Sequence, residues 1–445
     1  MPQPDRSDDR PQRSGPVSDG SASRARAARI LAEVLADGAT LPEALGRHGG
    51  EDEAFVRELC WGTARLAPRL EHFVRKHLKR APRAKDMDVH ALLLIGAYQL
   101  GWMNVPAHAS VHATVEATGR LGKNWAKGLV NAVLRRLSET DLHADDGLPD
   151  VARHAHPEWL LGALRRAWPD DWLAIVEAGN ARPPLTLRAR GDRDEALAHL
   201  ADAGIEAHAG RWAPAAIYLR EARDVREVPG FVEGDFSVQD EGAQLAAVLL
   251  DAAAGERVLD ACSAPGGKAL HILQQTPTVE LTAVDIDARR CERIRENLGR
   301  GGVEATVVEG DASTPAAWWD GRLFDRILVD APCTATGILR RQPDVRLLRE
   351  EGDVAKLATV QGELMDALWP LLKAGGTLVY CTCSVLPEEG EMIIEAFAAA
   401  HPDAVVSPIG ADWGVARGAG RQLLPTAGEH DGFFYARLTR AAQDA

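Results

Sequence analysis

Apolar residues recur at helical spacing from residue 24 to about residue 140, with no strand-like alternation among them. In the stretch RARAARILAEVLADG, one helical face is apolar and a glycine follows it: Ile30, Leu31, Val34, Leu35 and Gly38. The most apolar run, Val89–Met103, is shorter than the roughly 20 residues of a membrane span. It therefore predicts the central helix of an all-α domain at 24–140, and we expect no membrane partner.

The spacing of apolar and polar residues changes twice further along the chain. A polar linker and short helices occupy residues 141–180. Two strand-like runs, Leu185–Ala189 and Ala216–Arg220, then flank a helical run in a small α+β subdomain at 181–233. From 234 to 445 strands alternate with helices, which is typical of a doubly wound parallel α/β sheet.

Charge separates the helical segment from the rest. The net charge is −14, yet residues 24–138 hold 18 Lys and Arg against 11 Asp and Glu. This asymmetry indicates an anion-binding module joined to an acidic one, although ordinary variation between solvated surfaces gives the same numbers. Six scattered cysteines are too few for a disulfide framework, and residues 1–23 lack the apolar core of a signal peptide. We therefore predict reduced thiols, a cytoplasmic location and a disordered tail over 1–23.

The first strand of the α/β region runs into a glycine-containing turn, in the stretch ERVLDACSAPGGKALHILQ. Glycines let the backbone approach a ligand closely, and the helix that begins near Lys268 favours negative charge at its N-terminus. The turn is neither a Walker A loop nor a GxGxxG fingerprint, and taken alone it has a purely structural alternative.

Acidic residues end the next two strands. Asp285, 18 residues beyond Gly267, is placed to accept both hydroxyls of a ribose, and Asp311 is placed to reach an adenine edge. Asp287 predicts a helix N-cap instead. An adenosine-containing cofactor without a phosphate-binding fingerprint favours S-adenosylmethionine over NAD.

Three cysteines and a carboxylate lie at the ends of the last two strands of this series. FDRILVDAPCTATG delivers Asp330 and Cys333, and GGTLVYCTCS delivers Cys381 and Cys383. If these strands are neighbours, their ends lie roughly 5 Å apart at the edge where doubly wound sheets bind ligands. The residues alone do not rank Cys381 against Cys383, and a disulfide between Cys333 and Cys383 is a conceivable alternative. A metal site needs further Cys or His at ligand spacing; none is evident, so we expect no metal.

Three stretches of the helical segment carry a family resemblance: EDEAFVRELCWG, LLLIGAYQLGWMNVPAHASVHATVEATGRLG and GLVNAVLRRL. They resemble the NusB family of RNA-binding helical domains over nearly all of residues 24–137. The resemblance implies a NusB-like fold and a basic surface that contacts RNA. Most of these positions are typical of core packing, so they support the fold better than the function.

Five stretches between residues 234 and 438 carry a second resemblance: FSVQDEGAQL, CSAPGGK, DAPCTATG, TCSVLPEE and LLPTAGEHDGFFYARL. They are similar to the RNA 5-methylcytosine methyltransferases, which use S-adenosylmethionine. One small departure is Ser263, where alanine is commoner; so small a side chain should leave the loop intact. The resemblance implies a Rossmann-like class I methyltransferase domain at 234–445. Together with the NusB-like domain it implies a monomeric enzyme that acts on 16S ribosomal RNA, at cytosine 967 in the resembled family.

The same resemblance implies the roles of the site residues. Cys383 is the nucleophile that adds to C6 of the base, Cys333 assists breakdown of the adduct, and Asp330 hydrogen-bonds the N3/N4 edge. Cys381 is then a core residue of its strand, and Lys268 orients the cofactor or an acid beside it. The implied cofactor-binding residues are Cys262, Ser263, Ala264, Pro265, Gly266, Gly267, Lys268, Asp285, Asp311 and Asp330.

Basic residues follow Cys333 in the stretch ILRRQPDVRLLRE. Their position beside the base-handling strand end predicts RNA phosphate contacts by Arg340, Arg341 and Arg346, although solvated helix faces look the same. Two other functions stay open: a tRNA cytosine-C5 methyltransferase, which shares the catalytic motifs, and a non-catalytic RNA-binding ribosome assembly factor. Retention of both thiols, Asp330 and the complete loop argues against a decayed catalytic domain.

Overall fold

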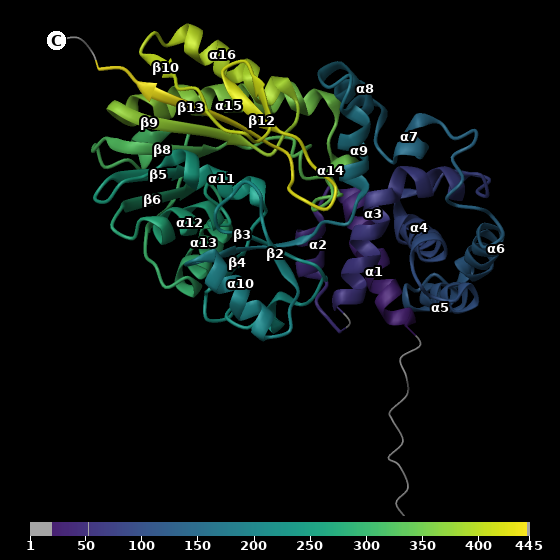
Figure 1. Ribbon diagram of the computed structural model, residues 1–445. Helices are drawn as coiled ribbons and strands as arrows, with labels where there is room; N and C mark the ends of the chain where they lie inside the picture. The colour runs from purple at the N-terminus through teal and green to yellow at the C-terminus, as the bar shows by residue number, and fades with distance from the viewer. Residues whose placement is uncertain (1–19, 52, 443–445) are drawn as a thin grey trace, which may run out of the picture. The chain divides into compact units, whose positions relative to one another are not determined.

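The computed structural model describes residues 20–51 and 53–442, in two compact units that divide the chain at residues 152 and 153 (Figure 1). The tail expected at 1–23 lies mostly outside the described residues, and helix α1 (Ser21–Asp37) begins before residue 23. Within the described part of the chain, no helix combines the length and the apolarity that a membrane crossing requires.

The first unit is a set of helices packed around one central helix, α4 (Met87–Trp102). The helices around it are α1, α2 (Leu41–Arg47), α3 (Glu53–Arg75), α5 (Ala107–Arg120) and α6 (Lys127–Leu137), with the short α7 (Asp150–His154) at the end of the unit. Because α4 is apolar on nearly every face, contact with α1, α3, α5 and α6 buries it almost completely. α1 ends at Gly38, whose left-handed backbone (φ +71°) suits glycine. The predicted all-α domain with a central helix is confirmed.

A small antiparallel sheet lies near the start of the second unit, in the order β2–β3–β1–β4. The strands of this sheet are β1 (Leu185–Ala189), β2 (Ala207–Ala209), β3 (Ala216–Leu219) and β4 (Phe236–Val238). The helices of this part of the chain are α8 (Glu158–Ala167), α9 (Trp172–Asn180) and α10 (Arg193–Asp202). Leu187, Ile217 and Phe236 pack with Leu200 of α10, which forms the predicted α+β core. β4 pairs with β1 and so belongs to this small sheet, although it lies beyond residue 233, where the sequence predicts the end of the subdomain.

A nine-stranded sheet forms the rest of the second unit, in the order β11–β12–β13–β9–β8–β5–β6–β7 with β10 paired to β13. The strands are β5 (Arg257–Ala261), β6 (Glu280–Asp285), β7 (Thr306–Glu309), β8 (Phe324–Asp330), β9 (Leu372–Thr382), β10 (Ala404–Val406), β11 (Val415–Arg417), β12 (Gly420–Leu423) and β13 (Phe433–Arg440). β9, β8, β5, β6 and β7 are parallel, and β13 runs antiparallel beside β9. The strand order reverses between β5 and β8, which is where doubly wound sheets bind ligands.

Helices cover both faces of the large sheet (Figure 1). One face carries α11 (Glu241–Leu250), α12 (Gly267–Gln275) and α13 (Ala288–Arg300); the other carries α15 (Glu351–Leu368) and α16 (Glu391–Ala400), with the short α14 (Val345–Leu348) ahead of α15. Side chains of β9 alternate between the two cores, so that Val379 and Cys381 lie in one and Leu378 and Tyr380 in the other. The predicted doubly wound α/β domain is confirmed, and Cys381 is a core residue of its strand, as predicted.

Candidate active site

The loop Cys262–Lys268 makes a tight turn between the end of β5 and the start of α12. Cys262 (φ +59°) and Gly266 (φ +92°) both have left-handed backbones. A Cβ on Gly266 would lie 3.1 Å from the Cα of Ile294, so a larger residue there would be both strained and crowded. The turn places the N-terminal amides of α12 at the carboxyl edge of the sheet, where they favour a polar ligand.

Two predicted acidic residues lie at the same edge. Asp285, at the end of β6, is buried and accepts a hydrogen bond from the backbone N–H of Ala264 at 3.1 Å. Asp311 follows β7 and accepts hydrogen bonds from the backbone and the hydroxyl of Ser313. Because β5, β6 and β7 are neighbours, the loop and both carboxylates come together. Asp287 caps α13 by accepting from the Arg290 N–H, which confirms the predicted N-cap.

Asp260 is a further carboxylate at this edge, and sequence reasoning missed it. It is fully buried; Oδ2 accepts a hydrogen bond from Ser263 Oγ at 2.7 Å, whereas Oδ1 has no hydrogen-bond partner among the described residues. Burial raises the pKa of Asp260 to about 7, helped by the charges of Asp330 and Asp285 and opposed by the Ser263 hydrogen bond. One sequence signal could have identified Asp260: it is an acidic residue inside the apolar strand RVLDA. Because unpaired charges are rarely buried, an acid in such a strand indicates a special role.

These groups fit a ligand that donates hydrogen bonds and carries positive charge. Asp285 and Asp311 offer acceptor oxygens, which suit ribose hydroxyls, an amino group or a sulfonium. The one basic residue of the loop, Lys268, is paired with an acid, so the loop has no free cation for a pyrophosphate. Across residues 20–51 and 53–442, no group of three His, Cys, Asp or Glu side chains is placed to hold a metal ion.

Lys268 joins the cofactor loop to the strand that carries Asp330. Its Nζ lies 2.6 Å from Oδ2 of Asp330, at the carboxyl end of β8. Burial alone would lower the pKa of the Lys268 ammonium, but the Asp330 carboxylate outweighs burial and raises it above the ordinary value. The other oxygen of Asp330 accepts a hydrogen bond from Cys381 Sγ at 3.4 Å. Of the two roles predicted for Lys268, contact with an acid beside it is the one observed.

Cys333 and Cys383 lie against each other, with their Sγ atoms 3.4 Å apart. Both are free thiols; Cys333 is 8% exposed and Cys383, the first residue after β9, is half-buried. The backbone N–H of Gly337 donates to the carbonyl of Cys383 at 2.9 Å and ties the two loops together. The hydrogen bond with Cys383, followed by burial, raises the pKa of Cys333 well above its ordinary value. The structure thus brings together the two thiols that the sequence places at neighbouring strand ends.

Glu389 is a second group that sequence reasoning missed. Its side chain is fully buried and accepts a hydrogen bond from the backbone N–H of Thr334, next to Cys333, at 2.7 Å. The stretch TCSVLPEE contains two consecutive glutamates, and only the first of them, Glu388, is exposed. No sequence signal separates the two, because the segment is too short to have a helical or strand period.

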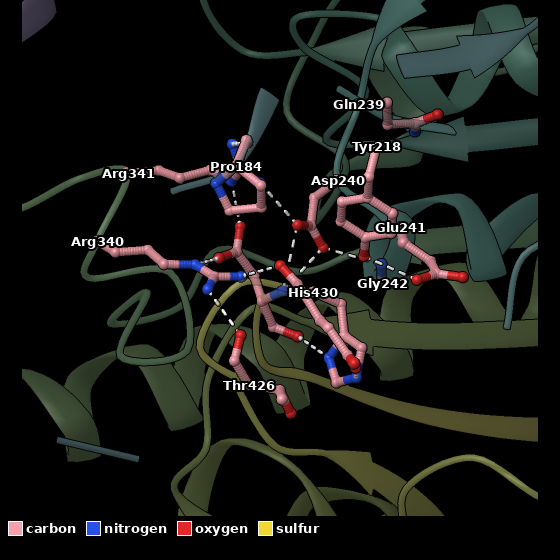
Figure 2. A network of polar contacts seen from close by, with 12 residues as sticks. Pro184, Tyr218, Gln239, Asp240, Glu241, Gly242, Arg340, Arg341, Thr426 and His430 are labelled. Carbon is pink, nitrogen blue, oxygen red and sulfur yellow. Dashed lines mark hydrogen bonds and ion pairs between the residues drawn. The ribbon is translucent and has the colours of Figure 1, made fainter. Parts of the chain in front are cut away.

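The predicted RNA contacts of Arg340 and Arg346 are wrong, because both side chains are buried. The contact of Arg341, which is partly exposed and pairs with internal carboxylates, stays a prediction. Arg340 is 1% exposed and its Nε lies 2.5 Å from Asp431 Oδ1. Arg341 pairs with Asp240 at 2.9 Å and with the other oxygen of Asp431 at 2.5 Å. Figure 2 shows both guanidinium groups pointing inward, toward Asp240 and the loop of Thr426 and His430.

Arg346 is likewise hydrogen-bonded to partners inside the second unit. It is 3% exposed and donates to the carbonyls of Ala155 and Gly179 and to Asn180 Oδ1. Arg340 and Arg346 therefore hold loops of the second unit together and present no charge to solvent, whereas Arg341 does so only in part. A basic stretch in a sequence does not reveal acceptors that lie far away along the chain, which is why the prediction failed.

Three family models match successive parts of the chain. Residues 21–139 match the NusB family, residues 156–226 match the ferredoxin-like domain of the Methyltr_RsmF/B-like family, and residues 247–439 match the 16S rRNA methyltransferase RsmB/F family. These matches follow the chain in the same order as its helical unit, its small sheet and its large sheet.

Several curated proteins are similar to this chain over nearly its whole length. Ribosomal RNA small subunit methyltransferase B from Pseudomonas putida is 48% identical over 429 residues, which covers 94% of this chain and 98% of that protein. The protein of that description from Escherichia coli O7:K1 is 42% identical over 426 residues, with the same coverage of each.

Solved structures extend the comparison to the fold. The structure of PH0851 covers 94% of this chain and 99% of its own, with a TM-score of 0.81 and 21% identity. A methyltransferase homolog protein from Pyrococcus horikoshii is 26% identical, with a TM-score of 0.58, and covers 66% of this chain and 97% of its own.

Proposed function

This chain belongs to the 16S rRNA methyltransferase RsmB/F family, and we propose that it transfers a methyl group to C5 of a cytosine in small-subunit ribosomal RNA. The observation that carries the proposal is the contact of 3.4 Å between Cys333 and Cys383, next to the ion pair of Lys268 and Asp330. Methyl transfer to an amino group would not need a nucleophilic thiol. We also propose that the protein acts as a monomer in the cytoplasm and that its NusB-like domain binds RNA.

S-adenosylmethionine is the methyl donor that we propose, and when bound it supplies an electrophilic methyl group. The residues proposed to hold it are the loop Cys262–Lys268, Asp285 and Asp311, with Asp330 beside them. Their acceptor oxygens fit the hydroxyls and positive charge of this donor. Because Asp285 is buried, its carboxylate acts in a low dielectric, where its attraction for positive charge is strong.

Cys383 is the proposed nucleophile. Its sulfur adds to C6 of the cytosine, which breaks the aromaticity of the ring and makes C5 nucleophilic enough to take a methyl group. The thiolate is the reactive form, and the Lys268 ammonium, whose raised pKa keeps it charged, favours that form nearby. The target base must leave its stack to reach a thiol at a strand end, so we expect a flipped or single-stranded cytosine.

Asp330 and Cys333 serve the later steps of the proposed mechanism. Asp330 accepts hydrogen bonds from the N3/N4 edge of the activated base, while its other contacts are with Lys268 and Cys381. After methyl transfer the C5 proton passes to solvent, the C6–S bond breaks and its electron pair returns to the Cys383 sulfur, which leaves as a thiolate. Cys333, kept as a thiol by its raised pKa, donates a hydrogen bond to that sulfur across the contact and so assists its departure.

A covalent trap tests this function. RNA that carries 5-fluorocytidine should leave a stable protein–RNA adduct in the presence of the methyl donor, since fluorine cannot leave as a proton does. Cys383→Ala should abolish the adduct, whereas Cys333→Ala should retain an adduct even with ordinary RNA. Methyl incorporation by Cys383→Ala at the normal rate would refute the assignment. Parallel reactions with 16S ribosomal RNA fragments and with tRNA separate the proposed substrate from the tRNA alternative.

A further inference from the structure

Because Cys333 and Cys383 are in contact, either sulfur could be the one that ionises to the reactive thiolate. Cys333 and Cys383 lie at neighbouring strand ends and share one hydrogen bond in which either sulfur is a possible donor. Only one thiolate is useful at a time, since two negative charges at this distance repel strongly. Something in the surroundings must therefore distinguish the two sulfurs.

Glu389 lies in the turn η6 (Pro387–Glu389), between the loops that carry the two thiols. Oε1 accepts a hydrogen bond from the backbone N–H of Thr334 at 2.7 Å, and Oε2 accepts one from the Thr334 hydroxyl. The hydroxyl of Ser384, the residue after Cys383, lowers the pKa of this carboxyl group against the larger opposing effect of burial. Because Thr334 follows Cys333 directly, the carboxylate holds the residue next to that thiol.

The sheet holds Glu389 itself in place. Its backbone carbonyl accepts hydrogen bonds from the Tyr380 hydroxyl at 2.9 Å and from the Thr382 hydroxyl at 3.2 Å, both on β9. Gln361 of α15 bonds the carbonyl of Pro332 at 2.8 Å and reaches Oε1 of Glu389 at 3.4 Å. The carboxylate is thus a fixed point between β9, α15 and the Cys333 loop.

Charge is distributed unevenly around the two sulfurs. The groups that face Cys333 are Cys383, Tyr380 and Glu389, and none of them is a cation. The hydrogen bond with Cys383 and burial raise the pKa of Cys333, and the Glu389 charge raises it further. The Lys268 ammonium interacts instead with Asp330, Cys381 and Cys383. The Glu389 anion therefore lies on the Cys333 side of the pair, and the Lys268–Asp330 ion pair lies on the Cys383 side.

We propose that Glu389 is a positioning residue, which fixes the contact between the two thiols and directs ionisation to Cys383 by keeping Cys333 a neutral thiol. The inference rests on the proposed function in naming Cys383 as the nucleophile and Cys333 as the thiol that donates a hydrogen bond to it. The carboxylate distinguishes two residues that are otherwise the same, because its charge opposes a thiolate at the nearer sulfur.

Site-resolved alkylation tests this proposal without RNA. The full-length protein is treated briefly with iodoacetamide at pH values from about 6 to about 10, and mass spectrometry measures modification at each cysteine. In the unmodified sequence, Cys383 should react at a lower pH than Cys333. In Glu389→Gln, which keeps the shape and removes the charge, Cys333 should react about tenfold faster at a given pH, equivalent to about one pKa unit. An unchanged ratio of Cys333 to Cys383 modification at every pH would overturn the proposal.

Two matched variants separate charge from structure. Glu388→Gln removes the same charge from the exposed neighbouring residue and should leave the ratio unchanged. Glu389→Asp keeps the charge on a shorter side chain and should restore the order of reaction even where it lowers the melting temperature. A purely structural role predicts instead that Glu389→Gln lowers the melting temperature with no change in the ratio. Absence of methyl transfer by the unmodified protein would refute the proposed function, while the alkylation order would still decide the role of Glu389.

Discussion

The Lys268 ammonium lies 2.6 Å from the Asp330 carboxylate and connects the loop Cys262–Lys268 to the end of β8. The pair spans 62 positions of sequence and joins α12, which follows β5, to β8, and the strand order reverses between β5 and β8. The residues that we propose for donor binding and for base activation consequently share one ion pair.

Lys268→Met should slow adduct formation with 5-fluorocytidine RNA by about 100-fold or more, because it removes the cation that favours the Cys383 thiolate. Single-turnover kinetics at saturating RNA and donor measure this. The matched control is Lys373→Met, which breaks the Lys373–Asp325 pair of 2.7 Å on the same sheet. That pair is half-exposed, so the control should change stability by less than about 1 kcal/mol and leave the adduct rate unaltered. Equal rates for Lys268→Met and the unmodified protein would contradict the role of Lys268.

Gly266→Ala should weaken donor binding, because the left-handed backbone strains a residue with a Cβ and the contact of 3.1 Å with the Cα of Ile294 forces the loop or α13 to shift slightly. We expect a loss of about 1–3 kcal/mol in stability and a lower affinity for S-adenosylhomocysteine, measured by calorimetry. Gly299→Ala, within α13 and with open space at its Cβ, is the control. It should be neutral or stabilising by up to about 1 kcal/mol, with unaltered ligand affinity. Normal ligand affinity in Gly266→Ala would count against the loop assignment.

Asp431→Ala should lower the free energy of unfolding by about 3–5 kcal/mol, because it leaves the buried guanidinium of Arg340 without its carboxylate. Urea titration at about pH 8 measures the change. Glu429→Ala removes a half-exposed acid from the same loop and should cost less than about 1 kcal/mol. If Asp431→Ala kept full stability but lost RNA affinity, the three arginines would have to be reconsidered as an RNA-binding surface.

Asp260→Asn should become more stable relative to the unmodified protein as pH rises from about 4 to about 7. The folded-state pKa of about 7 exceeds the ordinary value of 3.8, so in this window the folded state binds more protons than the unfolded state. Stability from this group is therefore lost as pH rises, and the asparagine variant lacks that loss.

Between about pH 4 and about pH 7, the free energy of unfolding of Asp260→Asn should rise relative to that of the unmodified protein by up to about 4 kcal/mol, at about 1.4 kcal/mol per pKa unit. Denaturation curves across the range measure it, and the exposed Asp202→Asn on α10 should show a constant offset. A constant offset for Asp260→Asn as well would mean that Asp260 carries no extra proton in the folded state.

The sequence by itself determined the helical unit around α4, the strands of the large sheet, and the placing of Asp285, Asp330 and Cys383 at strand ends. Apolar periodicity is a local property, and parallel strands in a doubly wound sheet must end at one edge, so these features follow from short stretches of chain. The proposal of Cys383 over Cys381 as the nucleophile came from a resemblance, and burial supports it: Cys381 packs into a core, whereas Cys383 lies just beyond the strand.

The partners of the charged groups were decided only by the tertiary structure. Arg340 and Asp431 are 91 positions apart, and Glu389 meets Thr334 across 55 positions. A side chain's charge is visible in the sequence, but whether that charge faces solvent or a carboxylate depends on segments that folding brings together. For that reason the stretch after Cys333 predicts an RNA contact, while the burial of the acids Asp260 and Glu389 beside the site is not predicted.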